Sequence, residues 1–332
     1  MSNERTAFVT GGSGFIGQAL LRRLASEGWK VRALARSDSS AATVAEAGAE
    51  AVRGDLDDVE SMRAGAQGCE VAFHSAAKLG GWGERDEFVR GNVAGTVNAL
   101  VACGAAGVRR FVHVGTEAAL LAGEPLVNAD ETWPLRPDSP AHYPATKAMA
   151  EQRVRRAPGD GFETVVIRPR LVWGPGDTTL LRALTQAMAS GRFAWIGGGH
   201  HLTSTTHVDN VVEGLMLGAE RGHSGEAYFI TDGEPAEFRD FITRLVATQG
   251  IEAPDSEMPA AVAGAAAAVA EALWSALPLP GEPPVTRLAV WLSSQECTLD
   301  ISKARRELGY APVITREQGL AAMSHHGRAS IG

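Results

Sequence analysis

Cysteine is scarce in this 332-residue chain, which contains Cys69, Cys103 and Cys297 and no others. They lie far apart, without the close spacing of a disulfide framework or of paired zinc ligands. His200 and His201 stand side by side in the sequence, but no third ligand follows them at helical spacing. A zinc site needs three or four protein ligands. We therefore expect no metal site.

The chain has fewer basic than acidic residues. The chain has 31 lysine and arginine residues against 39 aspartate and glutamate residues, a formal net charge of −8. This balance argues against nucleic acid or an anionic membrane as a partner. We also find no apolar signal segment at the N-terminus, because a predicted strand begins within a few residues of Met1. We expect a cytoplasmic enzyme.

Long apolar runs are also rare, and the one candidate for membrane contact is residues 258–277. Its length approaches that of a membrane span, but it is mostly alanine, which is only weakly apolar, and Glu271 interrupts it. We favour a helical lid or a packed surface helix. A helix lying on a membrane surface is the less favoured alternative.

Glycine, by contrast, is concentrated where the first predicted strand ends. Apolar residues 7–9 run into a glycine cluster, and a helical pattern of apolar residues follows directly. Gly11 allows the tight turn, Gly14 lets the backbone approach a pyrophosphate, and Gly17 lets the helix pack on the strand. The phosphates would lie at the helix N-terminus. We predict dinucleotide binding at Gly11, Ser13, Gly14, Phe15, Ile16 and Gly17.

The end of the second predicted strand bears on which cofactor is used. NAD-preferring sites usually carry an acidic residue there, which binds the ribose 2′-hydroxyl and repels a 2′-phosphate. This chain has Ala35 followed by Arg36. A guanidinium suits a phosphate through its fork of donors. NADP(H) is therefore favoured, NAD(H) stays possible, and the alternative for Arg36 is a solvated side chain.

Further cofactor contacts are expected at the ends of later strands, where ligands of parallel sheets bind. Asp55, before Leu56, could accept from the adenine amino group or cap the helix predicted at 57–66. Small side chains end the fourth strand and would let a ribose approach. The set expected from these strand ends is Asp55, Leu56, Ala76, Ala77, Lys78 and Pro169.

The order of these elements predicts the fold class. Strands and helices alternate up to residue 168, which indicates a doubly wound parallel α/β sheet of Rossmann type. Beyond residue 168 the chain becomes turn-rich and then mostly helical. We expect a dinucleotide-binding domain at 1–168. A smaller substrate-binding region at 169–332 would cross back in part to the sheet.

The catalytic prediction rests on Tyr143 and Lys147, four residues apart on a predicted helix and so on one face. A phenol of pKa about 10 is a poor catalyst at neutral pH, but a neighbouring ammonium together with the positive nicotinamide of the oxidised cofactor lowers that pKa. Thr116, at the end of the fifth strand, can donate to a carbonyl oxygen and accept from the phenol. Tyr143 and Lys147 also count as cofactor contacts, because Lys147 can hold ribose hydroxyls.

Several other polar and aromatic residues have two possible roles. Asn92, in the middle of a predicted helix, is either a structural tie or part of a proton path. Arg170 could anchor a substrate carboxylate, and a surface ion pair is the competing account. Trp82 and Trp173 are candidates for the substrate pocket or for the core. Glu117, beside Thr116, is interpreted as structural and counted among the residues near the substrate.

These residues lie in motifs that resemble the extended short-chain dehydrogenase/reductase superfamily, and most closely its 3β-hydroxysteroid dehydrogenase-like branch. The motifs are Thr10-Gly11-Gly12-Ser13-Gly14-Phe15-Ile16-Gly17, Gly54-Asp55-Leu56, His74-Ser75-Ala76-Ala77, Asn92-Val93-Ala94-Gly95-Thr96, Tyr143-Pro144-Ala145-Thr146-Lys147, Arg168-Pro169 and His207-Val208-Asp209-Asn210. The resemblance spans nearly the whole chain. The stretches 76–83, 168–177 and 281–287 are similar to bacterial members that reduce 2-alkyl-3-ketoacids on the way to long-chain olefins. Sterol-4-carboxylate dehydrogenases share much of the pattern.

The resemblance implies hydride transfer between NADP(H) and a ketone or alcohol on a bulky, apolar substrate. A 2-alkyl-3-ketoacid is the first choice, and oxidation of a 3β-hydroxysteroid, with or without decarboxylation, is the close alternative. A sugar-nucleotide epimerase and a non-catalytic NADP(H) sensor are further alternatives, and a homodimer is possible. The family's usual catalytic serine is Thr116 here. Where related dehydratases carry an Asp-Glu pair, only Glu117 follows.

Overall fold

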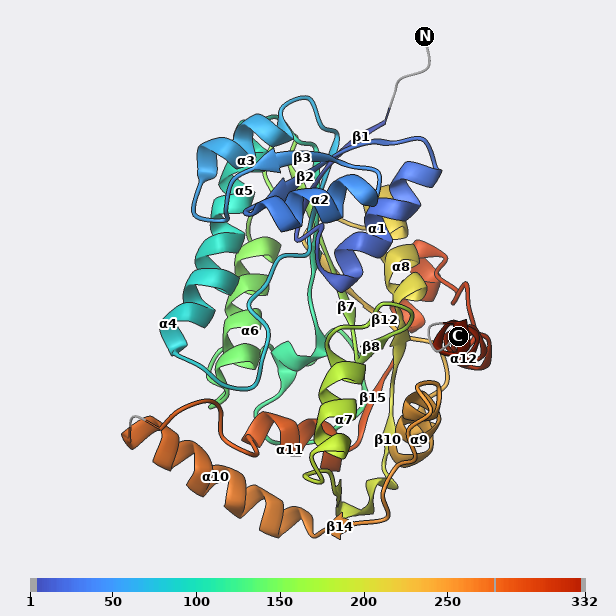
Figure 1. The fold of residues 1–332 in the computed structure, drawn as a ribbon. Helices are drawn as coiled ribbons and strands as arrows, with labels where there is room; N and C mark the ends of the chain where they lie inside the picture. The colour runs from blue at the N-terminus through green and yellow to red at the C-terminus, as the bar shows by residue number, and fades with distance from the viewer. Residues whose placement is uncertain (1–4, 278, 330–332) are drawn as a thin grey trace.

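The computed structural model describes residues 5–277 and 279–329. A seven-stranded sheet of order β12-β7-β5-β4-β1-β2-β3 forms its centre (Figure 1). Every neighbouring pair is parallel, which confirms the predicted fold class. The strands are β1 (Thr6–Thr10), β2 (Lys30–Ala35), β3 (Glu50–Arg53), β4 (Val71–His74), β5 (Arg110–Val114), β7 (Glu163–Pro169) and β12 (Glu226–Ile230).

Helices cover both faces of this sheet (Figure 1). On one face lie α1 (Phe15–Ser26), α2 (Asp38–Glu46) and α8 (Val208–Arg221), and on the other α3 (Val59–Ala66), α5 (Gly95–Ala105) and α6 (His142–Arg155). The first face packs through side chains such as Leu20, Leu24 and Leu215. The second packs through residues such as Met62 and Val154. Burial of these apolar surfaces on both sides holds the strand ends in place.

The chain reverses direction in the sheet between β1 and β4. It runs outward from β1 through β2 to β3, then returns to place β4 on the other side of β1. In open parallel sheets, ligands bind outside the carboxyl ends of the strands at such a reversal. The topology therefore places a binding crevice beside the glycine-rich turn after β1.

The helix predicted around Asn92 consists of three consecutive segments. These are α4 (Arg85–Phe88), the π-helical η1 (Val89–Ala94) and α5. The wide turn contains Asn92, whose side chain is buried. π-helical turns inside longer helices occur frequently at functional sites.

The second half adds a four-stranded sheet of order β13-β10-β15-β6. Its strands are β6 (Leu126–Ala129), β10 (Leu202–Thr203), β13 (Ala236–Glu237) and β15 (Cys297–Leu299). Two short pairs join β8 (Val172–Trp173) to β11 (Thr206–His207) and β9 (Trp195–Ile196) to β14 (Glu257–Met258). The helices are α7 (Leu180–Ala189), α9 (Phe238–Ala247), α10 (Ala260–Ala276), α11 (Arg287–Ser294) and α12 (Arg316–Ala329). Short helical turns are η2 (Glu117–Leu120), η3 (Gly197–Gly199) and η4 (Ala304–Leu308).

The two halves share the large sheet. β12 comes from the second half and pairs with β7, at the edge of the sheet. The domain boundary expected at residue 168 falls inside β7 (Glu163–Pro169). Residues 118–141 contain most of η2 and all of β6, and β6 pairs with the distant β15.

The alanine-rich segment at 258–277 forms α10, which runs across the outer edge of the second half beside α11 (Figure 1). Ala263 and Ala267 pack against Val290 of α11, whereas Val262 and Val269 are exposed. Within residues 5–277 and 279–329, none of the helices has the length and apolar character needed to cross a membrane.

Candidate active site

A large cleft of about 1470 Å³ lies along the carboxyl ends of the central strands. It is lined by the turn after β1, the ends of β2 to β5 and β7, the start of α6, and segments of the second half around α7 and α11. Most sequence-predicted site residues line it, namely Gly11, Ser13, Gly14, Phe15, Ile16, Arg36, Asp55, Leu56, Ala76, Ala77, Lys78, Thr116, Glu117, Tyr143, Lys147 and Pro169. One cleft therefore brings together the expected nucleotide and catalytic residues.

The glycine-rich turn fits a dinucleotide pyrophosphate. Gly11 has φ +74°, and a Cβ there would lie 2.5 Å from the backbone nitrogen of Ala76. A Cβ on Gly17 would lie 2.0 Å from the carbonyl oxygen of Gly11, so this residue sets the contact of α1 with the turn. No side chain caps the first turn of α1 at Gly14. Its N–H groups are therefore available to an anion.

The adenosine end of the cleft contains Arg36 and Asp55. Arg36 is exposed and follows β2 directly. Of the two roles expected for Asp55, Asp58 fills the helix cap, because its carboxylate accepts from the backbone of Ser61 at 3.0 Å. Asp55 instead accepts from the backbone of Leu56 at 2.6 Å and lines the cleft.

Lys147 is buried behind the cleft. Its ammonium donates to the carbonyl oxygen of Val114 at 2.8 Å, and its Nζ lies 3.4 Å from Nε2 of His113. Burial lowers the pKa of Lys147 to about 8, against a smaller opposing effect of Glu151. Sequence reasoning did not identify His113, whose side chain contacts the ammonium of Lys147.

Tyr143 lies one turn before Lys147 on α6 and lines the cleft. Burial raises the pKa of its phenol, and the negative charge of Glu117 raises it further, while the Thr116 hydroxyl opposes these effects. This direction is opposite to the one expected from the sequence. Burial of the phenol and the charge of Glu117 together outweigh the opposing effect of the Thr116 hydroxyl, so the surroundings favour the protonated phenol.

A buried ion pair lies next to these residues. Glu117 accepts from Arg170 Nη1 at 2.7 Å through one oxygen and from the Thr116 hydroxyl at 2.8 Å through the other. Arg170 is 1% exposed, also donates to Thr203, and is not part of the cleft lining. The expected anchor for a substrate carboxylate is therefore engaged elsewhere. Arg170 does form an ion pair, which was the alternative role. The pair is buried, however, whereas the alternative placed it at the surface.

Asn92 links the two sides of the cofactor crevice. Its side chain accepts from the backbone N–H of Lys78, donates to the carbonyl oxygen of Lys78, and donates to the hydroxyl of Thr146 on α6. The residue is buried and does not line the cleft. Its contacts match the structural tie and not the proton path.

The two tryptophans expected near the substrate lie differently. Trp173 is fully buried, donates to Asp232 at 2.8 Å and packs edge-on against His207 and Phe241. Of the two places expected for Trp173, the structure shows the core, because the side chain does not line the cleft. Trp82 is half-buried in the loop after β4, and its neighbours Gly80 and Gly81 line the cleft.

The substrate half of the cleft is largely apolar. Its lining includes Leu79, Leu171, Val172, Leu180, Ala183, Ala187, Pro283, Pro284, Val285, Leu288, Ala289 and Leu292. Many of these residues come from the loop before α11 and from α11 itself. Sequence reasoning did not assign them to the site, although stretch 281–287 was one of the motifs that carried the family resemblance. Such a wall favours a bulky apolar substrate.

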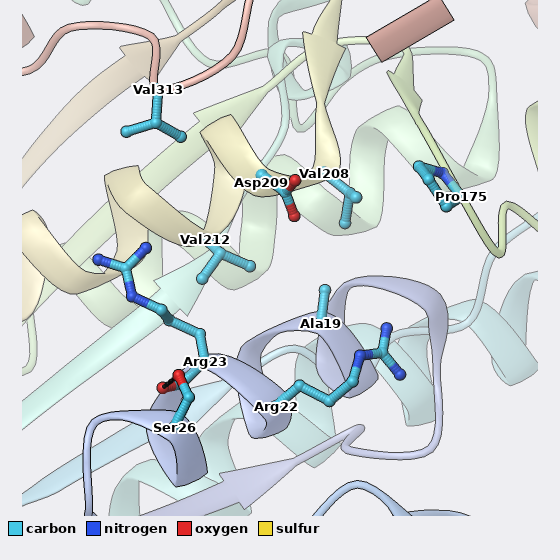
Figure 2. A pocket seen from close by; sticks show the side chains of 9 residues that line it. All are labelled: Ala19, Arg22, Arg23, Ser26, Pro175, Val208, Asp209, Val212 and Val313. Atoms are coloured by element: carbon cyan, nitrogen blue, oxygen red, sulfur yellow. Dashed lines mark hydrogen bonds between the residues drawn. The ribbon is translucent and has the colours of Figure 1, made fainter. Parts of the chain in front are cut away.

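A second hollow of about 530 Å³ lies between α1 and α8, and Figure 2 shows its side chains. Arg22 and Arg23 come from α1, and Asp209 from α8. Arg23 is already paired with Glu27 and Glu213. The hollow contains no residue predicted for the site. Asp209, in the motif after β11, therefore faces this hollow and not the cleft.

Comparison with known proteins agrees with this geometry. The sequence model of the 3-beta hydroxysteroid dehydrogenase/isomerase family matches residues 8–260. The chain belongs to this family. It is therefore an NAD(P)-dependent oxidoreductase of the extended short-chain type, which confirms the resemblance inferred from the motifs.

Two curated relatives cover almost the whole chain. The 4-hydroxy-2-methyl-3-oxo-4-farnesyl-3,4-dihydroquinoline-1-oxide ketoreductase of Stigmatella aurantiaca is 49% identical over 98% of this chain and 97% of its own. The 2-alkyl-3-oxoalkanoate reductase of Stenotrophomonas maltophilia is 39% identical over 94% of this chain and 96% of its own.

A solved structure confirms the fold. The dTDP-glucose 4,6-dehydratase DesIV of Streptomyces venezuelae, with NAD bound, superposes with a TM-score of 0.75. The superposition covers 98% of this chain and 97% of DesIV, at 22% identity. The chain therefore shares its Rossmann-type architecture with DesIV.

Proposed function

We propose that this family member is an NADP(H)-dependent reductase of a ketone on a bulky, apolar substrate. The observation that carries the proposal is the single cleft, which combines a pyrophosphate turn, Tyr143 with Lys147 and Thr116, and an apolar substrate wall. A ketone carbon placed between the strand ends and that wall would lie beside both the nicotinamide and the phenol.

The residues of the chain have separate tasks in this proposal. When bound, the nicotinamide supplies the hydride. Tyr143, whose raised pKa keeps it protonated, donates its phenol proton to the ketone oxygen. Lys147 holds the ribose hydroxyls and supplies positive charge near the phenol as that proton leaves. The apolar wall excludes water, which strengthens these interactions.

A 2-alkyl-3-ketoacid is our first choice of substrate. The relative from Stenotrophomonas maltophilia is a reductase named for this chemical class. Since Arg170 is engaged with Glu117, we propose Arg192, which is exposed on the cleft lining after α7, as a cation for a substrate carboxylate.

A neutral, prenylated ketone is the second candidate. It is favoured by the 49% identical relative, whose name specifies a farnesylated quinoline N-oxide. The volume of about 1470 Å³ and the apolar side chains of the cleft suit a farnesyl chain as well as a long alkyl chain.

The experiment is to follow NADPH absorbance with three ketones of different class. The panel holds a 2-alkyl-3-ketoacid, a farnesylated quinolone ketone and a 3-ketosteroid, with NADP⁺ reduction by the 3β-hydroxysteroid as a fourth assay. The proposal expects the highest kcat/KM with the ketoacid. A preference for the farnesylated ketone selects the second candidate, and reduction of the 3-ketosteroid alone rules out both substrate candidates. Turnover of the 3β-hydroxysteroid with NADP⁺ but of none of the three ketones with NADPH contradicts the proposal.

Cofactor preference is tested at Arg36. Because this guanidinium follows β2 and is exposed on the cleft lining, we propose that it binds the 2′-phosphate of NADPH. Replacing Arg36 by aspartate should raise the Kd for NADPH about 10- to 100-fold, since it exchanges a charged hydrogen bond for repulsion. The Kd for NADH should change little or fall. Equal NADPH affinity in both proteins, measured by fluorescence titration, would rule out this role.

A further inference from the structure

The ammonium of Lys147 contacts two groups of β5. It donates to the carbonyl oxygen of Val114 at 2.8 Å, and its Nζ lies 3.4 Å from Nε2 of His113. All three residues are buried. An ammonium has three N–H donors and no acceptor. Nε2 of His113 is therefore the acceptor in this contact whenever Lys147 is charged.

This direction specifies the tautomer of His113. A neutral imidazole carries its proton on one ring nitrogen and accepts at the other. With Nε2 accepting from Lys147, the proton lies on Nδ1, which is buried and has no hydrogen-bond partner within the part of the chain that the structure describes. Burial, and next the charge of Lys147, lower the pKa of His113 well below its usual range, so the imidazole is neutral. The contact with Lys147 is thus what sets this tautomer.

The neighbouring His74 has the opposite tautomer. The Thr96 hydroxyl donates its one proton to the carbonyl oxygen of Asn92 at 2.6 Å, so it can only accept from Nε2 of His74 at 3.0 Å. Nδ1 of His74 then accepts from the Thr10 hydroxyl at 2.7 Å. Burial, with a smaller effect of Lys147, lowers the pKa of His74 to about 3. Both of its nitrogens are therefore bonded on the β4 side, although its ring stacks on His113 with centroids 5.4 Å apart.

The other titratable groups near Lys147 lie on its own helix and on η2. Glu151, one turn later on α6, raises the pKa of Lys147, but its carboxylate is bound by Arg168 of β7 at 2.9 Å. Glu117 on η2 is likewise paired with an arginine. Tyr143 lies one turn earlier on α6. The carboxylates around Lys147 thus have partners of their own, and the lysine is held from β5.

We propose that His113 is a positioning residue, a neutral acceptor that holds the ammonium of Lys147 in place together with the carbonyl of Val114. The proposal deepens the proposed function and rests on it for its catalytic meaning, because Lys147 supplies the positive charge near the phenol of Tyr143. Two N–H groups of the ammonium then point to β5, and the third is left for the cleft that Lys147 lines. An acceptor also binds an ammonium more strongly than an amine, so His113 favours the charged lysine against burial.

The test titrates Lys147 in the cofactor-free protein by ¹³C NMR with label at Cε of lysine. The lysines of the chain are Lys30, Lys78, Lys147 and Lys303, and Lys147→Arg assigns the resonance of interest. In the wild type the midpoint is expected at about pH 8. In His113→Leu it should fall by about one pH unit or more, because the ammonium loses a charge-assisted hydrogen bond. Unchanged shifts of the other lysines report that the variant is folded.

His113→Gln is the rescuing variant, because its amide oxygen can accept from the ammonium in place of Nε2. The Lys147 midpoint should return to the wild-type value. Phe111→Leu is the matched control. Phe111 lies two positions earlier on β5 and packs on the ring of His74 at 5.6 Å between centroids, so its loss disturbs the same stack and spares the lysine contacts. A Lys147 midpoint that is unchanged in folded His113→Leu, or that falls equally in His113→Gln, would overturn the proposal.

A measurement on the wild type covers the case in which His113→Leu does not fold. Long-range ¹H–¹⁵N NMR correlations show which ring nitrogen of a histidine carries the proton, and His113→Gln identifies the signals of His113. Below the midpoint of Lys147, His113 should be the Nδ1–H tautomer and His74 the Nε2–H tautomer. A proton on Nε2 of His113 at that pH would contradict its role as acceptor.

The catalytic consequence is read from the pH dependence of kcat with the ketone preferred in the panel. Since the ammonium is the active form, kcat should fall as the pH rises through the pKa of Lys147. In His113→Leu this fall should occur at lower pH, and in His113→Gln at the wild-type pH. A fall at the same pH in His113→Leu and the wild type would contradict the positioning role. The NMR titrations need neither cofactor nor ketone, so their outcome is independent of the proposed function.

Discussion

Tyr143→Phe is expected to lower kcat for ketone reduction by about 10²- to 10⁴-fold, the usual contribution of a positioned general acid. The phenol lines the cleft together with Thr116 and Glu117 and is the general acid in the proposed function. Phenylalanine keeps the ring that packs against the sheet core and removes the proton that the developing alkoxide needs. The loss should fall on kcat, and the Kd for NADPH should change less than about threefold.

The measurement compares steady-state reduction with NADPH fluorescence titration in the same preparations. Trp133→Phe is a suitable control, since Trp133 is exposed and does not line the cleft. It should keep kcat within about twofold of the wild type, as expected for a surface exchange. Near-normal kcat in Tyr143→Phe would remove the tyrosine from the chemistry and leave the proton source unassigned.

Gly17→Ala is expected to raise the Kd for NADPH by about 100-fold or more, because the added Cβ would push the glycine-rich turn away from α1. The added Cβ would lie 2.0 Å from the carbonyl oxygen of Gly11 and 2.8 Å from the Cα of Gly12. Both contacts are backbone atoms, so no flexible side chain can yield. The turn and the N-terminus of α1, which we propose together hold the phosphates, would therefore separate.

Gly104→Ala is the matched control for this exchange. Gly104 lies in α5, and nothing comes within 4 Å of an added Cβ. Alanine in a helix interior stabilises by about 0.5–1 kcal/mol relative to glycine, so this variant should melt at or above the wild-type temperature and bind NADPH normally. Wild-type NADPH affinity in Gly17→Ala would contradict the proposed nucleotide site.

The central sheet could be predicted because its signals are local. The strand at 7–9 ends at Gly11, and the helix that follows begins at once, so a short window specifies strand, turn and helix. The small four-stranded sheet could not be predicted in this way. β10 and β13 have two residues each, and β15 pairs with a strand about 170 positions earlier in the chain, as Cys297 with Leu126 shows.

The site residues likewise fall into those that local sequence predicts and those that depend on distant partners. The nucleotide turn and the Tyr143–Lys147 pair depend on spacing within one element, and the structure places both in one cleft. Arg170 and Trp173 were misplaced because their partners, Glu117 and Asp232, lie more than 50 positions away. The pKa of Tyr143 was expected to fall because a sequence shows a neighbouring lysine but not the burial of the phenol.

The most direct test of ketone reduction at this site is transfer of deuterium to the substrate preferred in the ketone panel from NADPH that carries deuterium at both C4 positions. The account predicts that the product alcohol carries the label at the carbinol carbon, and that Tyr143→Phe slows its appearance about 10²-fold or more. A product without deuterium at that carbon, or label transfer at the wild-type rate in Tyr143→Phe, would contradict ketone reduction at this site.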